Sequence, residues 1–256
     1  MSYVDVTEKE KVHLLLGDNI KINDNLHVQS LTIRDVLNYG IQDLRIKYTL
    51  IAHDVDDFLD MLIGEDIYFE LFQKKSELNA LDFHIANTIN GGYYQEIFKS
   101  MLALMLGTEE SDIFIDDGVL KIFFPGSVDF IVVTPAEFDK IVFLFGLIIG
   151  EKTIESEKNK WNPADAKTRE VIEKLEKAER RKNRNKSEDG VATRDAIISA
   201  VCTKSNSINR LNIKEYTFYQ VLDEYSRLIK IENYQTSLDV LVHTGSDEIE
   251  LEPWYL

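Results

Sequence analysis

The spacing of apolar residues along the first 150 positions predicts several helices. Residues 48–63 and 92–106 place apolar side chains three or four positions apart, which is the period of a helix with one face on a core. Residues 137–149 are apolar at almost every position and follow Thr134-Pro135, a helix cap before a proline, so we expect a buried helix there. The predicted helices span residues 32–39, 48–63, 67–72, 92–106 and 137–149.

Short apolar runs beside turn residues predict strands in the same part of the chain. Residues 113–115 and 119–124 flank Asp116-Asp117-Gly118, and an Asp-Gly pair supplies the positive φ that a tight hairpin needs. The other predicted strands span residues 12–16, 20–22, 26–28 and 128–133. Helices combined with a small antiparallel sheet predict an α+β fold.

The last third of the chain is predicted to be helical. Residues 164–186 are expected to form a helix that is polar almost all round, because Glu and Lys/Arg recur there as favourable pairs four positions apart. A short helix begins at Thr193. A long one, capped by Asn212, runs from residue 213 to residue 243, and Gly245 ends it.

Charge divides the chain unevenly and places the predicted domain boundaries. Residues 1–160 carry 14 Lys/Arg and 28 Asp/Glu, a net charge of −14, whereas residues 161–256 carry 15 and 17, a net charge of −2. Few large apolar side chains occur between residues 151 and 190. We therefore expect an acidic α+β domain (1–160), a charged linker helix (161–190) and an all-helical interaction part (191–256).

Overall composition excludes several classes of protein. A net charge of −16 argues against a nucleic-acid binder, because phosphate contacts need surplus Lys and Arg. The single cysteine, Cys202, excludes an intrachain disulfide and suits a reducing cytosol. The longest apolar run, residues 141–149, is too short to span a bilayer, and the N-terminus lacks the pattern of a signal peptide, so we expect a cytoplasmic protein without a membrane segment.

Two acidic clusters and the cysteine are candidates for chemistry. His53-Asp54 matches the core pair of the HD-type metal phosphohydrolases, but no further histidine has a matching context, and an acidic solvent-facing helix surface is the favoured interpretation. Asp112, Asp116 and Asp117 suggest a calcium loop, although the spacing fits a hairpin turn better. Cys202 is interpreted as a buried cysteine rather than a nucleophile. Common catalytic motifs are absent from the sequence, so we expect no enzymatic activity, catalytic residue, metal or cofactor.

Two features of the last hundred residues suggest binding. Residues 167–186 carry nine Lys/Arg and four Glu, which suits either a docking arm for an acidic partner or nucleic acid or, as the favoured interpretation, a solvated linker helix. Aromatic residues gather further on, and these either bind a partner or pack on the protein itself. The predicted partner-binding residues are Tyr216, Tyr219, Tyr225, Trp254 and Tyr255.

Several segments, in order, resemble proteins of tailed bacteriophages that infect Gram-positive hosts. Residues 28–40 (VQSLTIRDVLNYG) resemble a strand-to-helix segment near the start of those proteins, and residues 161–165 (WNPAD) resemble their mid-chain. Residues 206–209 (NSIN), which lead into residues 213–225, resemble their C-terminal helix, and residues 252–255 (EPWY) their aromatic end.

The resemblance implies a tail morphogenesis protein, of which the closest type is a tail assembly chaperone. Such a chaperone engages the tape measure protein and recruits tail-tube subunits in the host cytoplasm. The alternative implied by the resemblance is a minor structural protein of the tail or baseplate, carried in the virion tail. A homo-oligomer is compatible with both alternatives.

Overall fold

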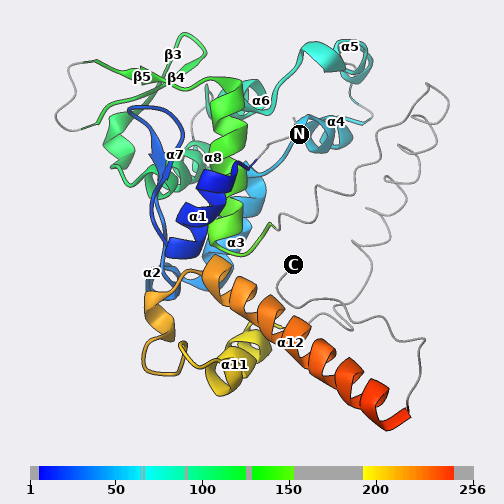
Figure 1. Ribbon diagram of the computed structural model, residues 1–256. Helices are drawn as coiled ribbons and strands as arrows, with labels where there is room; N and C mark the ends of the chain where they lie inside the picture. Colours follow the sequence, from blue (N-terminus) through cyan, green and yellow to red (C-terminus); the bar gives the residue numbers. More distant parts are fainter. Residues whose placement is uncertain are drawn as a thin grey trace.

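The computed structural model describes residues 6–63, 65, 67–89, 92–124, 129–152 and 193–244 (Figure 1). Two helices form the centre of the core, α7 (Tyr93–Leu106) and α8 (Pro135–Ile148). Thr134 and Glu137 cap α8 reciprocally, with Pro135 at its first position, as the sequence predicts. Every residue of α8 from Ile141 to Ile148 is buried, which confirms the buried helix.

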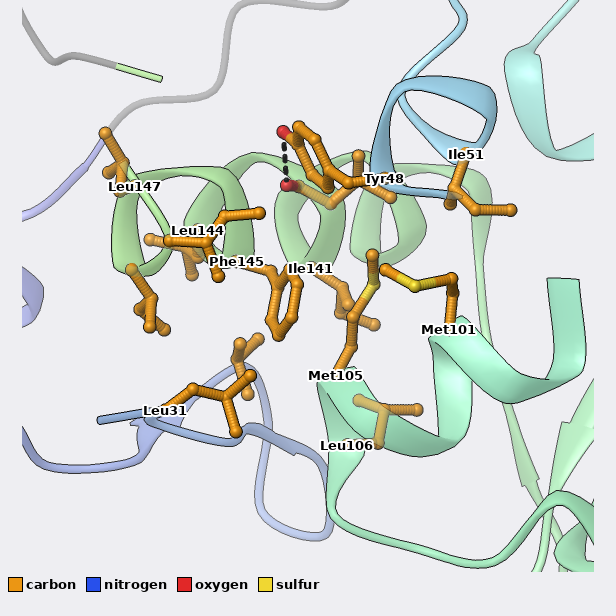
Figure 2. Close-up of a cluster of buried hydrophobic side chains, with 14 of the residues drawn as sticks. Leu31, Tyr48, Ile51, Met101, Met105, Leu106, Ile141, Leu144, Phe145 and Leu147 are labelled. Atoms are coloured by element: carbon orange, nitrogen blue, oxygen red, sulfur yellow. Dashed lines mark hydrogen bonds between the residues drawn. The ribbon is translucent and has the colours of Figure 1, made fainter. Parts of the chain in front are cut away.

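Figure 2 shows how the two central helices meet. Ile141 and Phe145 of α8 point toward Met101 and Met105 of α7, and all four side chains are buried. Tyr48 closes this layer from a third helix, and its hydroxyl donates to the carbonyl oxygen of Val142 at 3.1 Å. Burial raises the pKa of the Tyr48 phenol well above its usual range, so the hydroxyl stays protonated.

Two small antiparallel sheets complete an α+β fold, as the sequence predicts. The larger has the order β3-β4-β5, with β3 at Ile113–Asp116, β4 at Val119–Ile122 and β5 at Ile131–Val132. Asp117 and Gly118 both have positive φ, so the predicted hairpin turn is confirmed. The smaller sheet pairs β1 (Ile20–Lys21) with β2 (His27–Val28).

The remaining helices of the first 152 residues surround this centre. Two of them confirm predictions: α5 (Tyr68–Gln73) is the short helix predicted at residues 67–72, and α2 (Ile33–Tyr39) is the helix predicted after the cap Thr32. The complete set of surrounding helices is α1 (Glu8–Leu16), α2 (Ile33–Tyr39), α3 (Ile41–Ile51), α4 (Val55–Met61), α5 (Tyr68–Gln73) and α6 (Ala80–Ile89). Short 3-10 turns lie at Lys75–Glu77 and Glu110–Asp112.

Three predictions for this part are wrong or incomplete. Residues 12–16 belong to helix α1 rather than to a strand, because Thr7 and Glu10 form a capping box that starts a helix ahead of the apolar run. Residues 48–63 form the end of α3 and all of α4 instead of one helix, since the Asp54 carboxylate accepts from the Asp57 amide and begins a new helix. Helix α6 was not predicted.

Two helices follow residue 193, α11 (Arg194–Lys204) and α12 (Phe218–Thr244). The helix predicted after Thr193 is confirmed. The long helix begins five residues later than predicted, because Asn212 leads only into the 3-10 turn Ile213–Glu215. Thr217 and Gln220 instead cap α12, each accepting the other's backbone N–H, at 2.8 and 3.2 Å. The predicted helix at residues 164–186 and the stop at Gly245 lie outside the described residues.

One hydrophobic core crosses the predicted boundary between the first domain and the C-terminal part. Five apolar residues after position 200 are buried in the same cluster as α7 and α8: Val201, Ile208, Ile213, Phe218 and Val221. The backbone also joins the two parts, because Thr32 and Thr217 form an antiparallel bridge and the Ile33 N–H donates to the Tyr216 carbonyl at 2.7 Å. The two parts therefore do not have separate cores, while the boundaries at residues 160 and 190 stay a prediction.

Candidate interaction surface

Three of the five aromatic residues predicted to bind a partner lie in the described part of the chain. Tyr216 precedes α12, and Tyr219 and Tyr225 lie on its first half. All three are half-buried and pack against the core. Burial, together with the nearby Asp223 carboxylate, raises the pKa of the Tyr219 phenol. Each ring thus packs partly on the protein itself and keeps one side toward solvent, whereas Trp254 and Tyr255 lie outside the described residues.

The first half of α12 is anchored to the end of α8 by one arginine. The Arg194 guanidinium lies 5.0 Å over the ring of Phe218 and donates to the carbonyl oxygen of Ile149 at 3.2 Å. It also pairs with the Glu151 carboxylate, which the Arg45 Nε approaches at 3.5 Å. Gly150 has a positive φ and lets Leu222 of α12 come so close that a Cβ at position 150 would lie 2.9 Å from its Cδ1.

The second half of α12 leaves this anchor and projects away from the core (Figure 1). No residue from Leu228 to His243 is buried. Apolar side chains nevertheless recur along it at helical spacing, three or four positions apart: Leu228, Ile231, Tyr234, Leu238 and Leu241. We call these five residues together with Val242 the distal stripe of α12. Val242 is 72% exposed and Leu238 38%, whereas the other four are half-buried, and Leu228 at the start of the stripe still packs against the core.

A partly exposed apolar stripe on a projecting helix is suited to bind another helix. Soluble proteins do not commonly leave such a face open, and amphipathic helices bind partners through side chains at this spacing. The side-chain amine of Lys204 on α11 pairs with Glu232 of α12, so the end of α11 lies beside this part of the helix. The half-buried rings of Tyr219 and Tyr225 lie on the same helix, nearer to the core.

The acidic candidates for metal chemistry have other partners. Asp54 caps α4, and the His53 ring lies edge-on to the Phe58 ring with centroids 5.8 Å apart. Asp116 pairs with Lys121 across the hairpin at 2.6 Å, while the Asp112 carboxylate accepts from the Thr108 hydroxyl. Among the described residues, no group of three or more His, Cys, Asp or Glu is arranged to hold a metal ion. Cys202 is half-buried on α11, against the core.

Sequence reasoning missed His84, which is completely buried on α6. Its Nδ1 lies 2.5 Å from the Tyr94 hydroxyl, and its ring contacts those of Phe58, Phe98 and Phe138. Burial lowers the pKa of His84 to about 3, so the imidazole is neutral in the folded protein at neutral pH. Helical spacing on residues 80–89 would have been the signal, but polar residues interrupt it.

The described residues thus form an α+β protein with a projecting C-terminal helix. Residues 184–255 are similar to a protein family described as "YomV second domain", a match that includes all of α11 and α12. YomV is encoded by a Bacillus phage, and the match points to a phage-related protein. Neither a curated protein nor a solved structure matches the chain. Within the described ranges, no helix has both the length and the apolar character needed to cross a membrane.

Proposed function

We propose that this protein is a non-enzymatic tail morphogenesis protein of a tailed bacteriophage. In this proposal it is a tail assembly chaperone that engages the tape measure protein and tail-tube subunits in the host cytoplasm. The observation that carries the proposal is the distal stripe of α12, which lies inside the region similar to a phage protein domain and projects from the core. The resemblance of residues 28–40 and 213–225 to phage tail proteins supports the same assignment.

An assembly chaperone needs a surface that binds a partner and later releases it. The distal stripe suits reversible binding, because its six side chains are only partly exposed and can bury only a small apolar area against a partner. Burying such side chains contributes about 25 cal/mol per Å² of apolar surface, part of which offsets the cost of association. The half-buried Tyr219 and Tyr225 extend the same contact toward the core, and Tyr is enriched among residues that dominate binding energy.

A capture experiment from infected cells tests the proposal. The tagged full-length protein is expressed during infection, and the proteins that it retains are identified by mass spectrometry. We expect retention of the tape measure protein and tail-tube subunits, and loss of both with Leu238→Ser/Val242→Ser. The matched control is Leu15→Ser/Leu16→Ser on α1, where the two side chains are 37% and 65% exposed. Equal retention by both double variants would contradict the role of the stripe.

The same infection distinguishes the chaperone from a virion component. Mass spectrometry of purified particles is compared with that of the lysate. A chaperone is found in the lysate and not in the particles. A fixed number of copies in each particle would instead assign the protein to the tail or baseplate structure.

A further inference from the structure

A second apolar surface lies on the opposite part of the molecule from the distal stripe. Of the 19 large hydrophobic side chains that are exposed among the described residues, five fall between positions 61 and 72. We call them the α4–α5 surface: Met61, Ile63, Ile67, Phe69 and Phe72. Phe69 is 74% exposed, and α5 buries none of its residues. In Figure 1, α5 lies at the outer edge of the molecule, far from the end of α12.

One side of this surface, helix α4, is anchored to the core. Phe58 on α4 stacks on Phe83 of α6 with ring centroids 5.0 Å apart and meets the buried ring of His84 edge-on. After α5 in the chain, the side-chain amine of Lys75 pairs with the carboxylate of Asp56 on α4 at 2.5 Å, so the two ends of residues 56–75 lie close together. Helix α4 is therefore attached to the core through Phe58, whereas α5, which carries the exposed Phe69 and Phe72 and buries none of its residues, is held next to α4.

Charge identifies the chemistry of the partner. Residues 54–77 contain eight Asp or Glu and two Lys, a net charge of −6. Both lysines already pair with acids of the same segment, Lys74 with Glu70 at 2.9 Å and Lys75 with Asp56. A second copy of this surface would bring like charges together, and nucleic acids and anionic lipids carry the same sign as the surface. A partner with an apolar face bordered by Lys or Arg complements it.

We propose that the α4–α5 surface is a docking site for a basic amphipathic helix of a partner protein. The apolar face of that helix covers Phe69 and Phe72, and its flanking cations meet the carboxylates of Glu65 and Glu77. The site is separate from the distal stripe of α12, so the protein holds two partners at once and acts as an adaptor. This inference is independent of the proposed tail function, because it depends only on the exposure and charge of α4 and α5.

The test measures peptide binding to the full-length protein by fluorescence anisotropy. The probe is a labelled 18-residue peptide of Leu and Lys with one apolar helix face. Two control peptides keep its length: one has the same composition in scrambled order, and one has Glu in place of Lys. We expect the amphipathic basic peptide to bind at least about tenfold more tightly than either control, and binding to weaken as salt rises.

Protein variants with matched exposure locate the site. Phe69→Ser/Phe72→Ser is expected to weaken binding by about tenfold or more. The control Val12→Ser/Tyr93→Ser changes side chains that have the same exposed fractions, 52% and 74%, and leaves affinity within about twofold. Glu65→Lys/Glu77→Lys weakens binding several-fold and flattens its salt dependence, whereas Glu96→Lys/Glu110→Lys has a smaller effect because those residues lie elsewhere on the acidic surface.

Three results would overturn the inference. One is equal affinity of the wild type and Phe69→Ser/Phe72→Ser, and another is equal binding of the Lys and Glu peptides. The third is a wild-type dimer that Phe69→Ser/Phe72→Ser converts to a monomer in analytical ultracentrifugation, because a second copy would then occupy the surface. None of these measurements uses a phage protein, so they separate this inference from the function proposed for α12.

Discussion

Helices α8 and α12 use apolar residues in different ways. α8 is buried at every position from Ile141 to Ile148 and lies at the centre of the core. α12 is nearly twice as long, but only its first turns are buried, and its second half carries a narrow apolar stripe that is partly exposed. The difference teaches that apolar residues at helical spacing do not by themselves distinguish a core helix from a binding helix. The width of the apolar face and the way the helix is anchored decide between them.

The largest expected effect comes from truncating a side chain at the centre of α8. Phe145 is fully buried, and its ring lies 6.2 Å from that of Tyr48. Phe145→Ala is expected to lower the free energy of unfolding by about 3–5 kcal/mol, because it opens a cavity that the core cannot fill. Leu238→Ala on α12 should cost less than about 0.5 kcal/mol. Urea denaturation of both variants measures the contrast, and similar losses would show that α12 is as buried as α8.

Adding one methyl group to α8 should also be costly. A Cβ at Gly146 would lie 2.1 Å from the Tyr48 hydroxyl oxygen, so the phenol has to move. Gly146→Ala is therefore expected to destabilise the protein by about 1–3 kcal/mol. Tyr48→Phe removes that oxygen and should recover part of the loss in the double variant. A double-mutant cycle by thermal denaturation checks this, and strict additivity would contradict the close approach.

Removing the anchor of α12 should have a local effect. Arg194→Ala loses the contact with Phe218 and the pair with Glu151, at an expected cost of about 1–2 kcal/mol. Hydrogen exchange should accelerate in α11 and the first half of α12, and far less in α8. The control is Arg227→Ala, since Arg227 pairs with Asp223 on the same helix, at 2.7 Å. Uniform acceleration throughout the chain would mean that α12 and α8 open as one unit.

A smaller, pH-dependent effect is expected where α1 meets α8. Burial alone would raise the pKa of Glu10, but hydrogen bonds from Lys140 and Thr7 lower it below the ordinary value of 4.5 for a glutamate. The ionised carboxylate thus stabilises the fold above pH 4.5, and this contribution is lost as the pH falls through the folded-state pKa. Glu10→Gln should lower stability by about 1 kcal/mol at pH 7, and the difference from wild type should shrink in acid. A constant difference from pH 7 to pH 3 would contradict the pairing.

Local signals account for the parts of the fold that the sequence predicts correctly. The Thr134–Glu137 cap, the Asp117-Gly118 turn and the wide apolar face of α7 are all contained in short stretches of chain. The predictions failed where two signals compete. At α1 the apolar run suggests a strand, while the capping box of Thr7 and Glu10 lies ahead of it. At α4 the helical period continues across Asp54, so the break between two helices is not visible in the spacing.

The candidate site was less predictable, because it depends on contacts between distant residues. The aromatic content of the C-terminal part indicates an interaction region, but burial of Phe218 and the partial burial of Tyr216 depend on the bridge between Thr32 and Thr217. The end of the distal stripe is exposed because α11 ends beside Glu232 of α12 and does not continue along the rest of that helix. The α4–α5 surface could not be predicted, since Ile67, Phe69 and Phe72 have the composition of a core helix and only the fold leaves them uncovered.

Site-specific photo-crosslinking during infection tests most directly whether the distal stripe of α12 binds a phage tail protein. A benzophenone side chain is introduced at position 242 of the full-length protein, and at position 12 on α1, another exposed valine, as a control. Crosslinks from position 242 to the tape measure protein or tail-tube subunits, absent from position 12, are the predicted result. Crosslinks to the same proteins with equal yield from both positions, or none from position 242, would contradict the assignment of the distal stripe as the binding surface.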